Sequence, residues 1–314
     1  MDKPIYIEYL DCYVPETELE LASCPDLADS ISPYFADSVD FLKNAKSALL
    51  LDNIRIEQRL DLKEMVMSIA DRYMQSQRVD ARTVKYIIMA TDQSDGAKDF
   101  GHHILQRLGT PRSTVFRVTD NYCANVDVAI GLAAGLLRAE QKPSRAIIIS
   151  GTRLGKGLTG RVVGTYGILG DSAAITVLSN EEGPHLAEVR EQVVITRNEL
   201  AEIDLTKDNT LLHLQSYTIC LRELLAKSGL LPSMVDQVVF HNANELLILQ
   251  VAKSCKINAK AVNNSNQGKF GHLGTCDLVL NLKTILEGGD KAIKNIVALH
   301  LGVMGTYAAT HFVQ

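Results

Sequence analysis

Two kinds of hydrophobic pattern alternate along the chain. Short runs rich in Val and Ile, such as "RAIIIS", are typical of strands buried on both faces of a sheet. Between these runs, apolar residues recur every three or four positions, which predicts helices with one buried face. The predicted strands are 5–14, 84–91, 113–118, 145–150, 173–178, 189–196, 235–242 and 295–301. The predicted helices are 60–77, 99–109, 124–140, 210–228, 244–256 and 274–287. This alternation predicts an α/β fold.

The order of these elements suggests a duplication. The strand "VKYIIMAT" is followed by a helix and then by Cys123 at the start of a second helix. The strand "VDQVVFHN" is likewise followed by a helix and then by "FGHLGTCD", which leads into another helix. In this register Ala90 corresponds to His241, and Cys123 falls near His272. We therefore expect two pseudo-symmetric halves, 1–180 and 181–314, that bring Cys123, His241 and His272 to their shared junction.

Composition narrows the class of protein. The chain has 314 residues, 46% hydrophobic and 22% charged, as expected for one large globular unit or two packed halves. Its six cysteines are irregularly spaced and no secretory segment opens the chain, which predicts reduced thiols in a cytoplasmic protein. The net charge of −5 without a basic block argues against a nucleic-acid binder. The apolar run 126–137 is short for a membrane span and predicts a buried helix instead.

Cys123 is the most prominent candidate for chemistry. At the N-terminus of a helix, a thiol feels the positive end of the helix dipole and unpaired backbone N–H groups, which favour the reactive thiolate. The same N–H groups can stabilise an oxyanion during acyl transfer. The alternative is a small thiol that merely packs in the core.

His241 and His272 are the candidate partners of Cys123. His241 ends a buried strand in "VVFHNAN", where it could donate to a thioester oxygen, activate Cys123 as a base, or simply be a core residue. His272 lies in "GKFGHLG", whose glycines allow close approach to a ligand, although an exposed loop histidine would fit the same pattern. The remaining histidines, which have no convergent partners in the sequence, are predicted to be structural: His102, His103, His185, His213, His300 and His311.

A zinc site is an alternative use of the same residues. His272 and Cys276 are four positions apart, and Cys123 and His241 could complete a set of four ligands. The chain has no compact Cys-Cys or His-His ligand pair, so we predict no metal, with Cys276 packing in a helix.

Several motifs together resemble a known family. "DNYCANVDVAIGLAAGLL" resembles the nucleophile segment of thiolase-fold condensing enzymes, and most closely that of β-ketoacyl-acyl-carrier-protein synthase III. "GTYGILGDSAAITVL" resembles the family's Gly-Asp-Gly-Ala stretch, "HNAN" (241–244) its His-Gln-Ala-Asn motif, and "LGVMGTYAAT" (301–310) its C-terminal glycine-rich turn. These segments follow the family's order over nearly the whole chain.

The resemblance implies a five-layered αβαβα fold and a homodimer. It implies that Cys123 accepts an acyl group from coenzyme A or acyl carrier protein, and that a malonyl-type thioester then loses carbon dioxide and attacks it. His241 would polarise the thioester carbonyl, the backbone N–H groups of Cys123 and Val303 would form the oxyanion hole, and Asn244 would bind substrate. No further cofactor is implied.

The chain also departs from the synthase III pattern. His272 stands where that family has Asn, as in the relatives that use two histidines. Trp, which could stack on the adenine of coenzyme A, is absent, which favours a carrier-protein donor. These departures suggest a specialised, secondary-metabolic pathway. Two alternatives stay open: acyl transfer to a hydroxyl or amine without decarboxylation, and a non-catalytic subunit of a heteromeric synthase.

Overall fold

The structure is a computed structural model that describes residues 3–76, 80–91, 100–197 and 209–314. Among these residues the largest sheet has the strand order β11-β12-β13-β10-β1-β9-β6-β4-β5. Its strands are β1 (Tyr6–Tyr13), β4 (Val84–Ala90), β5 (Thr114–Val118), β6 (Arg145–Thr152), β9 (Ser172–Ser179), β10 (Ala187–Thr196), β11 (Gln237–Phe240), β12 (Asn295–Gly302) and β13 (Thr306–Val313). The helices are α1 (Leu27–Ile31), α2 (Ser38–Ser47), α3 (Leu62–Ser76), α4 (Phe100–Leu108), α5 (Asn125–Ala139), α6 (Thr210–Lys227), α7 (Glu245–Ser254), α8 (Gln267–Phe270) and α9 (Asp277–Glu287).

The strands form two sets with the same pairing pattern. In the first set β4 is parallel to β5 and β6, and β9 is antiparallel to β6 and β1. In the second set β11 is parallel to β12, and β13 is antiparallel to β12 and β10. A parallel bridge between Val238 and Val262 occupies the place that β5 has in the first set. Within the described residues, the pairing that joins the two sets is the short one of Tyr6 and Ile7 of β1 with β10.

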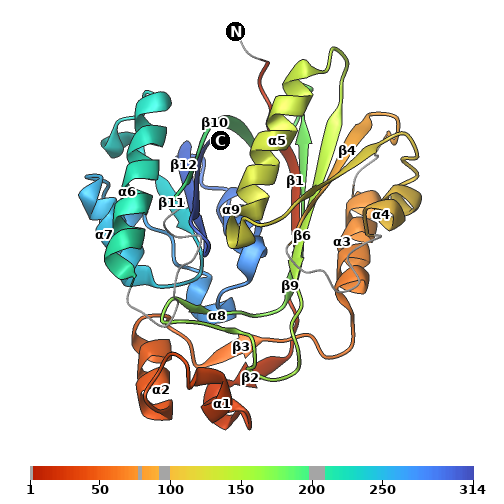
Figure 1. Cartoon of the computed structure of the whole chain (residues 1–314). Helices are drawn as coiled ribbons and strands as arrows, with labels where there is room; N and C mark the ends of the chain where they lie inside the picture. Colours follow the sequence, from red (N-terminus) through yellow and green to blue (C-terminus); the bar gives the residue numbers. More distant parts are fainter. Residues whose placement is uncertain (1–2, 77–79, 92–99, 198–208) are drawn as a thin grey trace.

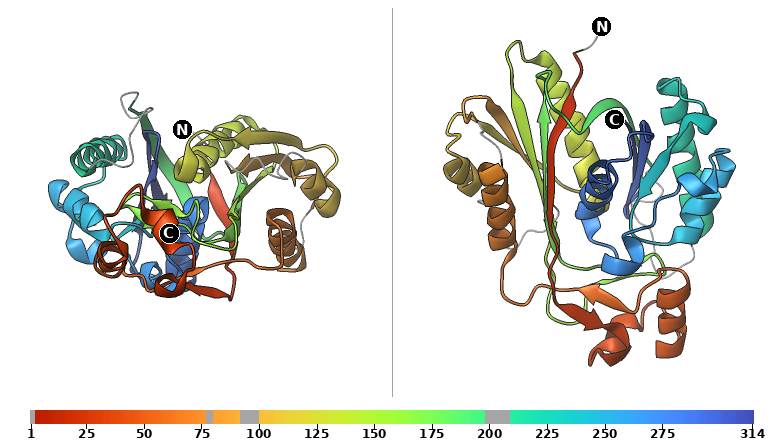
Figure 2. Two further views of the ribbon diagram at one scale, coloured as in Figure 1. Left: turned by 60° about the horizontal axis from the view of Figure 1, so that its bottom comes forward. Right: turned by 180° about the vertical axis from the view of Figure 1, so that it is seen from behind.

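The helices and the two strand sets stack in five layers. Figure 1 shows α3 and α4 outside the first set, α6 and α7 outside the second set, and α5 and α9 between the two. The view from behind in Figure 2 shows the same order. Apolar residues of α5 and α9 form one continuous buried cluster with residues of both strand sets. The predicted αβαβα architecture of two pseudo-symmetric halves is therefore confirmed.

Helix α5 lies at the centre of the molecule because its residues are small and apolar. Its Gly131 faces Gln192 so closely that an added Cβ would lie 1.9 Å from Oε1 of that side chain. By length and composition alone the window Tyr122–Ala139 would suffice to cross a membrane, so the expectation that this run is too short was wrong. Half of the window is nevertheless buried inside the fold, as expected of a core helix.

Every predicted strand and helix is present, with ends shifted by a few residues, and positions 77 and 99 lie outside the described residues. The pattern did not reveal the C-terminal strand β13, which is rich in Ala and Thr. It also did not reveal the cap below the layers in Figure 1, formed by α1, α2, β2 (Glu18–Glu20) and β3 (Asn53–Arg55). Two further short strands, β7 (Val162–Val163) and β8 (Gly167–Ile168), pair with each other.

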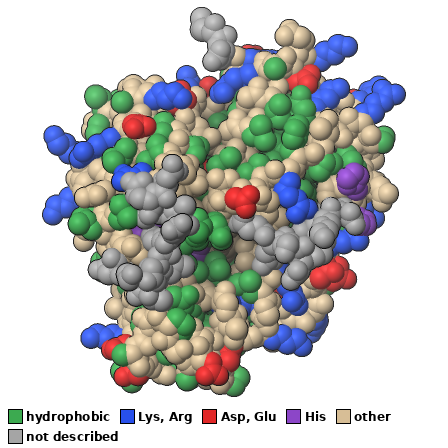
Figure 3. Space-filling model, in the orientation of Figure 1, with side chains coloured by type: hydrophobic (Ala, Val, Ile, Leu, Met, Phe, Trp, Pro, Cys, Tyr) green, Lys and Arg blue, Asp and Glu red, His purple; other side chains and the backbone are tan. Residues whose placement is uncertain are grey.

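The distribution of charged side chains on the surface is consistent with the modest net charge of −5. On the face shown in Figure 3, basic, acidic and hydrophobic side chains are mixed.

Candidate active site

Cys123 lies in a tight turn, the 3-10 helix Tyr122–Ala124, which leads directly into α5. The residues before it have positive φ angles, 67° at Asp120 and 48° at Tyr122. Such angles are costly for residues with side chains and occur mostly where the surrounding structure imposes them, often at functional sites. The turn is held by hydrogen bonds from Ala124 N to Asn121 O (3.0 Å) and from Asn121 N to the Asn125 side chain (3.1 Å).

The end of β12 packs closely against this turn. A Cβ at Gly302 would lie 2.1 Å from the carbonyl oxygen of Asn121, so no other residue fits without moving the backbone next to Cys123. The Thr306 hydroxyl also donates to the Asn121 side-chain oxygen at 3.2 Å. Val303 lies in the turn between these two residues.

His272 contacts the sulfur of Cys123. Its Nε2 lies 3.4 Å from Cys123 Sγ. The backbone before it requires a glycine, because Gly271 has a φ of 68°. The backbone of His272 is anchored by a hydrogen bond from Gly170 N to its carbonyl oxygen (2.8 Å), and its ring lies against Gly167, where a Cβ would be 3.1 Å from Cδ2.

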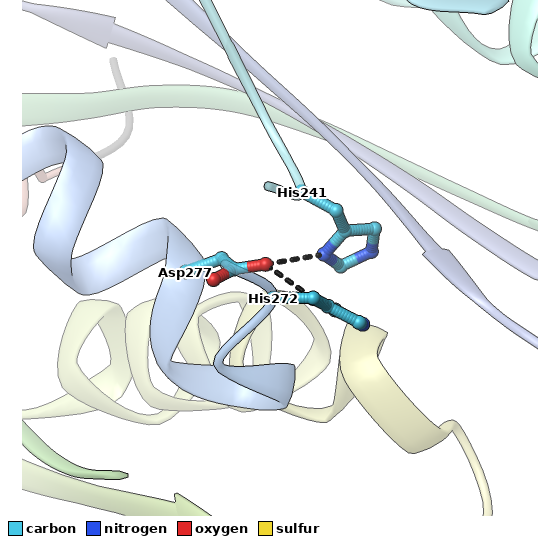
Figure 4. Close-up of side chains that lie close together, drawn as sticks. All are labelled: His241, His272 and Asp277. Atoms are coloured by element: carbon cyan, nitrogen blue, oxygen red, sulfur yellow. Dashed lines mark hydrogen bonds and ion pairs between the residues drawn. The ribbon is translucent and has the colours of Figure 1, made fainter. Parts of the chain in front are cut away.

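Asp277 holds the other side of the His272 ring. This carboxylate is fully buried at the first position of α9 and accepts a hydrogen bond from His272 Nδ1 at 2.5 Å. It also accepts from the backbone N–H groups of Asn242 (2.9 Å) and Leu273 (2.8 Å). Figure 4 shows the carboxylate directed at both His272 and His241. Sequence reasoning did not select Asp277, although it follows His272 by five residues at a helix start.

The charges in this chain of residues stabilise one another. Burial by itself would lower the pKa of His272, but the negative charges of Asp277 and Cys123 outweigh it and raise the pKa to about 10. Burial would raise the pKa of Asp277, but His272 and His241 hold that pKa well below its usual range. His272 is therefore protonated at neutral pH and can stabilise a thiolate on Cys123.

His241 is a neutral imidazole beside Cys123, His272 and Asp277. Burial, and then the neighbouring His300, lower its pKa to about 3. Its Nε2 lies 2.8 Å from the backbone nitrogen and 3.0 Å from the carbonyl oxygen of Leu301, and its Nδ1 lies 3.7 Å from Asp277 Oδ2. Its ring centroid is 5.1 Å from that of His272 and 4.5 Å from that of His300. His300 in turn pairs with the buried carboxylate of Asp127 at 3.1 Å.

A cavity of about 110 Å³ brings the predicted residues together. Cys123, His241, His272 and Val303 all line it. Asn244 does not; its side-chain oxygen accepts from Leu247 N at 3.2 Å and caps α7, while the adjacent Ala243 lines the cavity. His213, predicted to be structural, also lines it, together with Tyr166 and Tyr217.

These residues do not fit a metal site. Cys276, a ligand in the zinc alternative, is buried against the Ser150 hydroxyl 3.6 Å away. The acceptor atoms of His241, His272 and Asp277 do lie within 4.8 Å of one another. Asp277 and His272, however, use the atoms that would face an ion to bond each other directly.

Part of the chain matches a known protein family. Residues 225–312 match the family model described as 3-oxoacyl-(acyl-carrier-protein) synthase III, C terminal. That segment contains His241, His272, Asp277 and Val303, but not Cys123. No curated protein sequence matches the chain.

Solved structures match the chain over its whole length. ChlB3, described as an acyltransferase, superposes with a TM-score of 0.81 at 17% identity, over 99% of this chain and 97% of that one. The 3-oxoacyl-(acyl-carrier-protein) synthase III of Aquifex aeolicus gives 0.80 at 17% identity, over 99% and 100%. A variant of OleA from Xanthomonas campestris gives 0.77 at 16% identity, over 99% and 98%. The chain has the thiolase fold of the synthase III enzymes. The resemblance drawn from the sequence is thereby confirmed, and the prediction of an acyltransferase of the synthase III type agrees with both the family model and the fold.

Proposed function

We propose that this chain is an acyltransferase in which Cys123 receives an acyl group from a coenzyme A or acyl-carrier-protein thioester. The contact between Cys123 Sγ and His272 Nε2, with Asp277 behind the ring, carries this proposal. The protonated His272 stabilises the thiolate, which attacks the thioester carbonyl. As the intermediate collapses, the carbon–sulfur bond of the donor breaks, the donor leaves as a thiolate that takes a proton from water, and the acyl group stays on Cys123 Sγ.

The oxyanion formed in that attack needs hydrogen-bond donors. We assign this role to the backbone N–H groups of Cys123 and Val303, which belong to two turns that border the same cavity. The Gly302 contact with Asn121 keeps these turns together.

In the second half-reaction, a malonyl-type thioester loses carbon dioxide and its carbanion attacks the acyl group on Cys123, which breaks the bond between the acyl carbon and Sγ and releases Cys123 as a thiolate. His272 donates from Nε2 to the developing enolate oxygen, and the neutral His241 lies beside it. This condensation matches the activity named for the synthase III relatives.

Acyl transfer to a hydroxyl or amine is the second candidate, and one observation favours it. Nε2 of His241 is in contact with the Leu301 backbone, so His272 and Asp277 are left as the acid–base pair beside Cys123. Once the leaving donor thiolate has taken the Nε2 proton of His272, the neutral His272 can deprotonate an incoming alcohol or amine without decarboxylation. ChlB3 is described as an acyltransferase.

Intact mass measurement tests the loading step. Incubation with a panel of acyl-CoA and acyl-carrier-protein donors should add one acyl group to the wild type and to Cys12→Ala, but none to Cys123→Ala. Absence of an adduct with every donor would instead support a non-catalytic subunit of a heteromeric synthase.

Release of carbon dioxide from malonyl-carrier protein distinguishes condensation from simple acyl transfer. Release by the acylated enzyme supports condensation, whereas product on an alcohol or amine without release supports simple transfer. His272→Asn should retain part of the condensing activity because its amide still donates, and His272→Ala should lose more than about a hundredfold. Full activity of His272→Ala would contradict its role.

The wider setting is also part of the proposal. The enzyme works as a cytoplasmic homodimer in a specialised pathway, with thioester substrates and no further cofactor, nucleic acid or membrane. Asn244, as the cap of α7, would position the Ala243 edge of the cavity for the substrate.

A further inference from the structure

A second polar cluster lies in the cavity that holds Cys123. His213 of α6 is fully buried, and its Nδ1 is 2.7 Å from the hydroxyl of Tyr307 in β13. The Tyr166 ring packs edge-on against the His213 ring at 4.9 Å, and Tyr217 packs against Tyr307 at 5.1 Å. His213, Tyr166 and Tyr217 line the same cavity as Cys123, while its other walls are largely aliphatic.

One nitrogen of this cluster is unsatisfied. Nε2 of His213 is buried and has no hydrogen-bond partner among the residues that the structure describes. Burying such a group without a partner costs free energy, so a polar group that reaches Nε2 through the cavity lined by His213 would gain a hydrogen bond. The proposed catalytic steps use His272 and His241, not His213.

The chemistry of Nε2 limits what can bind there. Burial lowers the pKa of His213 to about 4, so the ring is neutral at pH 7 and has a single N–H. The Tyr307 hydroxyl can donate to Nδ1 or accept from it, so Nε2 can be either a donor or an acceptor. A hydroxyl group satisfies both cases. A carboxylate does not, because His272 is already paired with Asp277 and no Lys or Arg is among the described residues that line the cavity, so a buried negative charge would have no partner.

The cavity also limits size. Its volume of about 110 Å³ is small, which favours a short acyl group.

We propose that His213 determines the acyl specificity of this site, and that the acyl group carried by Cys123 is a short hydroxyacyl group whose hydroxyl binds His213 Nε2. This inference rests on the proposed function, since it names the acyl group that Cys123 receives. His213 acts as a binding residue and takes no part in bond making or breaking.

Two donors that differ by one oxygen test it. Wild type is incubated with butyryl-CoA or 3-hydroxybutyryl-CoA, and with the same acyl groups on pantetheine, and the rate of acyl-enzyme formation is followed by intact mass. We expect the hydroxylated group to be loaded at least tenfold faster. His213→Phe removes both nitrogens and should reverse the preference, whereas His213→Gln, which keeps a polar atom, should retain part of it.

Tyr307→Phe provides a milder variant in case His213→Phe does not fold. It removes only the oxygen that fixes Nδ1, so the preference should fall several-fold while loading of butyryl persists. Equal rates for the two donors in the wild type, or a faster rate with butyryl, would overturn the inference and mean that Nε2 binds only water. An unchanged ratio in both His213→Phe and Tyr307→Phe would overturn it as well.

The outcomes separate this inference from the proposed function. Adducts with both acyl groups but no preference would leave Cys123 as the acyl carrier and refute the role of His213. No adduct with any donor would refute the proposed function, and this inference with it.

Discussion

Asp277 binds Nδ1 of His272 at 2.5 Å, and this contact decides which nitrogen of His272 faces Cys123. A carboxylate that accepts from Nδ1 leaves Nε2 as the nitrogen beside the sulfur, as carboxylates bonded to one ring nitrogen of a histidine do elsewhere. The negative charge also favours the imidazolium form of His272.

Replacing Asp277 by Asn tests this relationship. Without the carboxylate, the pKa of His272 falls and its positive charge beside the sulfur is weakened. We expect alkylation of Cys123 by iodoacetamide at pH 7 to slow by roughly tenfold or more, because a neighbouring cation activates a thiol.

The other cysteines provide an internal control. Burial raises the pKa of each remaining thiol, those of Cys12, Cys24, Cys220, Cys255 and Cys276. Peptide mass mapping should therefore find alkylation at Cys123 first. Labelling of Cys123 by Asp277→Asn at the wild-type rate would refute the role of the carboxylate.

Gly167 offers a way to move His272 without touching its chemistry. An added Cβ would lie 3.1 Å from His272 Cδ2, which is closer than most such contacts, so the ring must shift by a few tenths of an ångström. We expect Gly167→Ala to lower kcat/KM by about tenfold, since small misplacements of reacting groups are costly, with little effect on unfolding.

Gly183→Ala is the matched control for Gly167→Ala, because nothing lies within 4 Å of its added Cβ. Equal activity of the two variants would show that the position of the His272 ring is not critical.

The sequence predicted the layers of the fold better than its periphery. Strands such as β6 were predictable because burial on both faces leaves a continuous Val/Ile run. β13 was not, because it is buried by its pairing with β10 and β12 while its own residues, largely Ala, Thr and His, have no strong strand pattern.

The same contrast holds for the site. Cys123 and His272 could be predicted because their local sequence, a helix start and two flanking glycines, carries the signal. Asp277 and His213 gain their roles from contacts with residues that the fold brings to them, so a buried aspartate and a helical histidine look structural in the sequence. The pair of His300 and Asp127 was missed for the same reason.

A buried ion pair supports the loop between β6 and β9. Arg161 and Asp171 are fully buried, with contacts of 2.9 and 3.0 Å, and Asp171 also accepts from Leu154 N and Glu57 N. Arg161→Met leaves the carboxylate buried without its cation, which should cost roughly 3–5 kcal/mol of the free energy of unfolding. Urea denaturation measures this loss.

Arg82→Met is the control for Arg161→Met. Arg82 is exposed and pairs with Asp80 at 2.8 Å, so its replacement should leave the free energy of unfolding nearly unchanged. Similar losses in both variants would mean that burial of the Arg161 pair does not matter to stability.

The buried histidines predict how stability depends on pH. Burial lowers the pKa to about 3 for His241 and to about 4 for His213 and His311. Between the ordinary pKa of 6.5 and these values the unfolded chain binds more protons than the folded one, so stability should fall as the pH drops from 6.5 towards 4. The effect of His272 is opposite, because its pKa is higher in the folded chain. Its contribution to the free energy of unfolding is fully present below pH 6.5 and is lost as the pH rises through about 10.

His213→Phe isolates one of these contributions. A histidine whose pKa falls from 6.5 to about 4 on folding lowers the free energy of unfolding by roughly 3 kcal/mol at pH 4 and by almost nothing at pH 7. The difference in the free energy of unfolding between pH 7 and pH 4 should therefore be smaller in His213→Phe than in the wild type by about that amount. Urea titrations at both pH values measure it, and comparing each protein with itself removes the packing change that the substitution causes. If the two proteins lost the same stability between pH 7 and pH 4, His213 would be as easily protonated in the folded chain as in the unfolded one, and burial would not lower its pKa.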